Sequence, residues 1–170
     1  MPEPKRVGDL EIDQDLPHER LEWRIERVGW IVMALMLLAA LVGLLGPGPL
    51  SSTTAGEKGS TLWVEYNRFE RYQAPAMLRV HLGPGAARDG KARLWLNREY
   101  VENIELHHID PEPESVEVGH DRLIYTFNLP DSTQPTAVTY YLEANKYGRM
   151  PLRVGLDAGP QQNFSQFYYP

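Results

Sequence analysis

The chain has 170 residues, a formal net charge of −6 and no cysteine. Without thiols it can form neither disulfides nor cysteine-ligated zinc sites, and thiol catalysis is excluded. The absence of a basic patch argues against nucleic acid as a partner. Thirteen arginines against four lysines, with many Gly, Pro and Ala residues, are typical of GC-rich bacteria.

Residues 1–27 form a polar segment of mixed charge, which we interpret as a cytoplasmic N-terminal segment. Its first fifteen residues carry too little apolar surface to fold by themselves. A helix is predicted from about residue 17, because Pro17 suits a first helical turn and apolar side chains recur after it at helical spacing. The segment would orient the chain in a membrane, and docking of a cytoplasmic partner is the alternative.

The most apolar stretch, residues 28–45, reads VGWIVMALMLLAALVGLL and carries no charge. A helix of this length measures roughly 27 Å, which is close to the thickness of the hydrocarbon core of a bilayer. Its apolar side chains surround the helix, whereas a helix of a soluble core has an apolar stripe on one side. Gly46 and Pro47 then end the run. The sequence therefore predicts a transmembrane helix, in preference to a buried helix of a globular protein.

The flanks of this stretch predict its orientation. Arg20, Arg24 and Arg27 precede it closely, whereas the first cation after it is Lys58. Because basic flanks stay in the cytoplasm, we expect the N-terminus inside and the C-terminal domain in the periplasm, beyond the inner membrane. A cleaved signal peptide is the alternative, but the preceding segment is long and acidic, and the apolar run exceeds the usual length.

Residues 46–60, GPGPLSSTTAGEKGS, have the composition of a linker. From residue 61 the apolar period changes to two, which is typical of half-buried strands, and turn signals separate the runs. We predict a mainly β fold in which residues 61–170 form an antiparallel, immunoglobulin-like β-sandwich of about seven to nine strands. The strong strands are predicted at 61–66, 76–82, 92–97, 123–129, 138–144 and 152–157, and weaker ones at 103–109, 115–118 and 164–169.

Three histidines, His107, His108 and His120, lie in an acidic stretch that suggests a metal site. Adjacent side chains on a strand point to opposite faces, so His107 and His108 cannot bind one ion. We expect His108 to face the core, which leaves His107 with His120 or His81 as possible ligands. We therefore predict no metal site, and a metal ion remains part of the alternative function given below.

Two further segments have more than one interpretation. Prolines keep residues 110–114, Asp-Pro-Glu-Pro-Glu, extended, so their carboxylates should not converge on a calcium ion. We interpret this segment as a solvated edge or loop, with a partner contact as the alternative.

Residues 164–170 are rich in aromatic side chains. They predict either the last strand of the sandwich or an aromatic patch for a partner or a membrane surface.

No catalytic constellation stands out, and we predict neither an enzyme nor a bound cofactor. In architecture only, the layout resembles bacterial single-pass proteins that hold an immunoglobulin-like domain outside the inner membrane. We therefore expect an inner-membrane accessory or scaffold protein, embedded in the lipid bilayer, whose periplasmic domain contacts another membrane or envelope protein. The alternative is a membrane-tethered periplasmic binding domain for a metal ion or small ligand.

Overall fold

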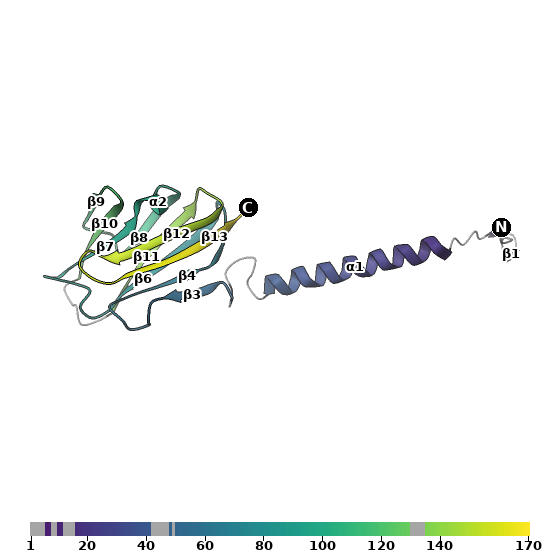
Figure 1. Ribbon diagram of the computed structural model, residues 1–170, viewed down its shortest axis with the longest axis horizontal. Helices are drawn as coiled ribbons and strands as arrows, with labels where there is room; N and C mark the ends of the chain where they lie inside the picture. Colours follow the sequence, from purple (N-terminus) through teal and green to yellow (C-terminus); the bar gives the residue numbers. More distant parts are fainter. Residues whose placement is uncertain (1–5, 8–9, 12–15, 42–47, 49, 130–134) are drawn as a thin grey trace. The chain divides into compact units, whose positions relative to one another are not determined.

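The computed structural model of the protein describes residues 6–7, 10–11, 16–41, 48, 50–129 and 135–170. The chain divides into two compact units, Met1–Ala39 and Ala40–Pro170. The first begins with a short antiparallel pair of strands, β1 (Arg6–Val7) and β2 (Leu10–Glu11). Helix α1 (Leu16–Leu41) follows (Figure 1).

Helix α1 exposes apolar side chains along its described part. Its large apolar residues between Trp23 and Leu41 are 46% to 76% exposed. Near its start, the Arg27 guanidinium lies 3.7 Å from the centroid of the Trp23 ring. Among the described residues, no helix meets the length and hydropathy needed to cross a membrane. Residues 42–45 of the predicted span lie outside the described residues.

The second unit consists of two facing β-sheets (Figure 1). The first sheet has the order β5-β13-β12-β7-β10-β9 and the second the order β3-β4-β6-β11-β8. A single helical turn, α2 (Arg98–Val101), connects β7 to β8. The strands of the first sheet are β5 (Phe69–Arg71), β7 (Lys91–Asn97), β9 (Ser115–Val118), β10 (Arg122–Asn128), β12 (Gly148–Leu156) and β13 (Gln161–Tyr169). Those of the second are β3 (Ser52–Ala55), β4 (Leu62–Asn67), β6 (Pro75–Leu82), β8 (Ile104–Asp110) and β11 (Thr136–Ala144).

Alternation along the strands decides which side chains form the core. On β4, Leu62 and Val64 are fully buried, Tyr66 packs against the core from the same side of the strand, and Trp63 and Glu65 point outward. From the opposite sheet, Leu94, Phe127 and Leu152 are fully buried in the same core. Burial of these side chains stabilises the unit by roughly 1.5–3 kcal/mol each. The mainly β, two-sheet and sandwich-like fold predicted from the period of two is thereby confirmed.

Two strands of the second unit were not predicted. β3 lies inside the segment assigned to the linker, and it pairs with β4 from Ser52↔Asn67 to Ala55↔Val64. Four residues without apolar alternation give no strand signal, so only the pairing reveals β3. β5 has three residues and runs parallel to β13, so the sheets are not purely antiparallel. The described part of the second unit therefore has eleven strands, against the seven to nine predicted.

A β-bulge corrects the prediction for His108. The register of β8 on β11 shifts between Tyr141 and Leu142, which inserts one residue into β8. Ile104 and Ile109, on either side of the shift, are therefore both buried, whereas His108 is exposed. The prediction that His108 faces the core was wrong because it assumed unbroken alternation.

Candidate functional site

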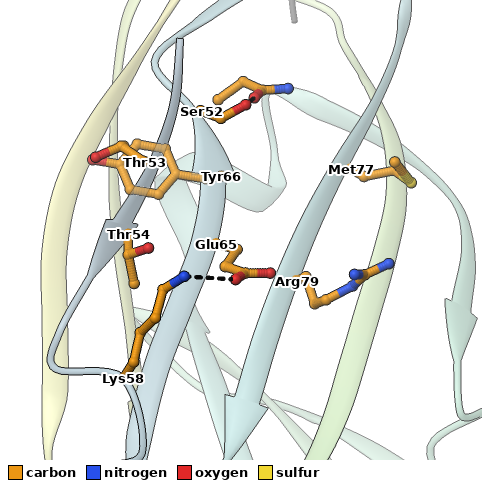
Figure 2. A pocket seen from close by; sticks show the side chains of 9 residues that line it. Ser52, Thr53, Thr54, Lys58, Glu65, Tyr66, Met77 and Arg79 are labelled. Atoms are coloured by element: carbon orange, nitrogen blue, oxygen red, sulfur yellow. Dashed lines mark hydrogen bonds and ion pairs between the residues drawn. The ribbon is translucent and has the colours of Figure 1, made fainter. Parts of the chain in front are cut away.

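The outer face of the second sheet contains a groove of about 420 Å³ over β3, β4 and β6 (Figure 2). Because Leu62 and Val64 point into the core, their neighbours Trp63 and Glu65 point outward. The same alternation on β6 turns out the side chains between its buried residues. We call the resulting surface the groove face, and it comprises Lys58, Trp63, Glu65, Met77, Arg79, His81 and Tyr141.

Glu65 lies at the centre of a charged cluster on this face. Its carboxylate lies 3.2 Å from Nε2 of His81 and 3.6 Å from Nζ of Lys58. Figure 2 shows the Lys58 and Glu65 side chains pointing toward each other. Burial alone would raise the pKa of the Glu65 carboxyl, but the hydrogen bond and charge of His81, with Lys58, hold this pKa below its usual value. Glu65 is therefore a carboxylate at neutral pH.

An aromatic stack holds the other end of the cluster in place. Trp63 and His81 are paired across β4 and β6, their ring centroids are 3.5 Å apart and their planes differ by 2°. Lys58 Nζ lies 5.8 Å from the centroid of the Trp63 ring. Since these side chains are already ordered by one another, a partner that binds here loses little conformational entropy in fixing them.

The remaining groups of the groove face are those that protein interfaces favour. Met77 is 52% exposed and Tyr141 is 38% exposed, and the two residues are paired across β6 and β11. Arg79 is exposed, and no ion pair in the described part of the chain includes it. Protein–protein interfaces are enriched in Trp, Tyr, Met and Arg relative to the rest of the surface. The composition of the groove face therefore resembles that of protein–protein interfaces.

The groove borders an open strand edge. β3 is the edge strand of its sheet, and in the described structure only β4 pairs with it. Its four residues, Ser52–Ala55, include no charge and no proline, the usual protections of an exposed edge. An extended segment of a partner could add to this edge through main-chain hydrogen bonds while its side chains reach the groove.

The predicted histidine candidates do not converge. His107 Nε2 lies 3.3 Å from a carboxylate oxygen of Glu143, and His120 is exposed in the turn between β9 and β10. His108 stacks on Tyr141 with centroids 6.0 Å apart. Within the ranges that the structure describes, no three His, Asp or Glu side chains are placed to hold a metal ion.

The acidic segment runs from the end of β8, the edge strand of the second sheet, to β9, the edge strand of the first. Glu112 is exposed, and the Glu114 carboxylate lies 2.8 Å from Nζ of Lys91. β9, which follows, is exposed along its whole length. These observations agree with the interpretation of residues 110–114 as a solvated edge.

A hollow of about 550 Å³ lies at the other end of the sandwich, between the loops that follow β6 and β12. Three basic residues contribute to its lining. Arg93 forms ion pairs with Glu117 and Asp157, and the Arg88 guanidinium donates to the carbonyl oxygen of Ala158. Because Arg93 is already paired with carboxylates, the hollow offers less free positive charge than its composition suggests.

The aromatic tail forms β13, the last strand, which confirms one of the two interpretations of residues 164–169. Its buried side chains belong to a polar network inside the sandwich. Tyr100 donates to Oε1 of Gln166 at 2.8 Å, and the hydroxyl of Tyr168 lies 3.3 Å from the same oxygen. Gln166 Nε2 donates to the carbonyl oxygen of Asn67 at 3.0 Å. Burial raises the pKa of Tyr168 to about 12, so its phenol stays neutral.

Glu70 is the carboxyl buried beside this network. It is 5% exposed and accepts one hydrogen bond, from Nδ2 of Asn67 at 2.8 Å. Burial raises the pKa of Glu70 above its ordinary value of 4.5, and the hydrogen bond from Asn67 offsets this only partly. The folded chain therefore holds this proton to higher pH than the unfolded chain does.

We expect Glu70→Gln to remove a pH dependence of stability. Between pH 4.5 and the raised pKa the folded state binds more protons, so the free energy of unfolding of the natural protein falls as pH rises. Gln keeps the oxygen that accepts from Asn67 but carries no charge, so the variant should be the more stable protein at pH 7 to 8. Urea unfolding at a series of pH values measures this, with exposed Glu112→Gln as the control. Parallel curves for the natural protein and Glu70→Gln would contradict the prediction.

No protein-family model matches this chain, and no curated protein matches its sequence significantly. The groove face is therefore identified as the candidate site from its geometry alone. The outward position of Trp63 and Glu65 follows from the period of two, and His81 was weighed only as a metal ligand. Their clustering depends on the register of β4 on β6, for which the sequence carries no signal.

Proposed function

We propose that the chain is a single-pass bacterial inner-membrane protein whose periplasmic, immunoglobulin-like β-sandwich is an accessory or scaffold module for another membrane or envelope protein. In this proposal the chain has no catalytic role. Residues 28–45 are the membrane anchor, and the groove face is the surface that contacts the partner.

The exposure of α1 supports the anchor. Its large apolar side chains are exposed around the helix, an arrangement that water disfavours and a bilayer accommodates. The apolar run continues from Leu41 to Leu45 in the sequence without a charge. The three arginines that precede it favour a cytoplasmic N-terminus.

The observation that carries the scaffold role is the make-up of the groove face. On an ordinary protein surface, large apolar side chains are exposed singly and at scattered positions. This face instead combines an ordered Trp63–His81 stack, exposed Met77 and Tyr141, and Arg79 without a described ion pair. The open edge of β3 lies beside it.

A single introduced cysteine tests topology and partner together, because the natural chain has none. Met77→Cys should react in intact spheroplasts with a membrane-impermeant maleimide. When the same variant is labelled with a photoactivatable maleimide and illuminated, it should form one defined crosslinked adduct. Mass spectrometry then identifies the partner protein in this adduct. Adding Arg79→Glu should abolish the adduct without reducing the labelling, because the charge at the centre of the contact is reversed.

Ala158→Cys is the matched control, since Ala158 is exposed at the other end of the sandwich. It should be labelled in spheroplasts as well as Met77→Cys but should give no adduct. Labelling of both variants only after lysis would overturn the orientation. Labelling without any adduct at Met77, or an adduct that survives Arg79→Glu, would overturn the scaffold role of the groove face.

A further inference from the structure

The chain enters the sandwich at a well-defined corner. Ser51 is fully buried, and its carbonyl oxygen accepts from the backbone N–H of Arg68 at 2.8 Å. Its hydroxyl donates to the carbonyl oxygen of Phe69 at 3.0 Å and lies 3.1 Å from the Phe69 N–H. The first residues of the domain are thus bonded to the start of β5.

Aromatic side chains gather around this corner. Phe69 is paired with Phe167 across β5 and β13, and Phe167 is 46% exposed. Tyr147, which precedes β12, is 69% exposed and meets the Tyr72 ring edge-on with centroids 6.2 Å apart. A hollow of about 490 Å³ lies beside Phe69 and Phe167. Exposed aromatic rings of this kind are favoured at the interface between a bilayer and water.

Positive charge accompanies these rings. Arg68, Arg71, Lys146 and Arg149 are all exposed, and none takes part in an ion pair among the described residues. Arg68 donates to the Thr53 hydroxyl and Arg149 to the Ser165 hydroxyl, which directs both guanidinium groups without neutralising them. We call these four cations, with Phe69, Tyr72, Tyr147 and Phe167, the entry surface.

The carboxylates nearby do not cancel this charge. Glu70, between Arg68 and Arg71 in the sequence, is buried. Glu99 lines a small hollow with Lys146 and Arg149, but no described ion pair joins it to either cation. The entry surface is therefore positive in a chain whose net charge is −6.

We infer that the entry surface docks on anionic phospholipid, with its arginines at the lipid phosphates and its aromatic rings in the interfacial layer. The inference rests on the proposed membrane anchor. Five residues separate Leu45, the last residue of the proposed anchor, from Ser51, so the corner lies at most roughly 20 Å along the chain from the hydrocarbon core. A connection of this length keeps Ser51 within reach of the lipid headgroups. The positive charge of the entry surface is complementary to the negative charge of anionic headgroups.

The full chain in lipid nanodiscs tests the inference. Tyr147→Cys is labelled with the fluorophore NBD, and quenching by headgroup spin-labelled lipid is measured in discs of phosphatidylcholine with or without phosphatidylglycerol. Ala158→Cys is the control, because nine residues of β12 place it roughly 30 Å further along the sandwich. We expect strong quenching at Tyr147→Cys in the anionic discs, and weak quenching at Ala158→Cys in both kinds of disc.

Replacing Arg68, Arg71 and Arg149 together by Gln should reduce quenching at Tyr147→Cys to the level of the control. Each arginine removed should lower the ratio of docked to undocked domain by roughly fivefold. Equal quenching at the two positions, or quenching that depends on neither the anionic lipid nor the arginines, would overturn the inference and favour a protein contact there. Failure of the chain to co-elute with the discs would instead overturn the anchor itself, and with it this docking.

Discussion

Phe127→Ala should lower the free energy of unfolding of the sandwich by about 3–5 kcal/mol. Phe127 is fully buried on β10, a strand paired on both sides by β7 and β9. Its removal takes away the transfer free energy of the ring and leaves a cavity that paired strands cannot collapse to fill. Urea unfolding followed by far-ultraviolet circular dichroism measures the loss.

Phe167→Ala is the matched control, because it makes the same chemical change at a position that is 46% exposed. We expect it to cost less than about 1 kcal/mol. If the two variants were equally stable, Phe127 would not lie between the sheets, and the assignment of the core would be wrong.

Gln166→Leu should destabilise the protein by about 3 kcal/mol, although leucine has nearly the same volume. Gln166 is 1% exposed, and its amide serves Tyr100, Tyr168 and the Asn67 carbonyl. The substitution leaves the carbonyl without its described partner, and the two hydroxyls, 3.3 Å apart, with only each other. Buried polar groups without partners lose their hydration and gain nothing in return.

Two comparisons separate this effect from packing. Gln161→Leu makes the same change at an exposed position on the same strand and should leave stability nearly unchanged. Combining Gln166→Leu with Tyr100→Phe and Tyr168→Phe removes the orphaned hydroxyls and should recover part of the loss. A triple variant that is less stable than Gln166→Leu alone would show that the hydroxyls have other partners.

The sequence could predict which residues of the candidate site point outward, but not which of them lie together. Alternation on β4 and β6 puts Trp63, Glu65 and Arg79 on one face, because a period of two depends only on local backbone geometry. That His81 lies against both Trp63 and Glu65 depends on which strands are neighbours and in what register. Register is set by pairing across segments distant in the sequence, so a local pattern cannot contain it.

The entry surface shows the same limit more strongly. Residues 164–169 were predicted as a strand or as an aromatic patch. In the structure they belong to β13, which has both buried and exposed aromatic side chains. Tyr168 is buried and Phe167 is exposed, because adjacent residues of a strand point to opposite sides. The four cations lie on β5, β12 and the connections beside them, and only the parallel pairing of β5 with β13 gathers them around one corner.

By itself, the sequence determined the mainly β character of residues 61–170 and the positions of the long strands. Each depends on the spacing of apolar side chains, which is a local property. Only the tertiary structure decided that β3 and β5 exist, that a bulge turns His108 to solvent, and that the candidate metal ligands stay apart. These outcomes depend on hydrogen bonds between strands far apart in the chain, and such partners become known only when the sheets are assembled.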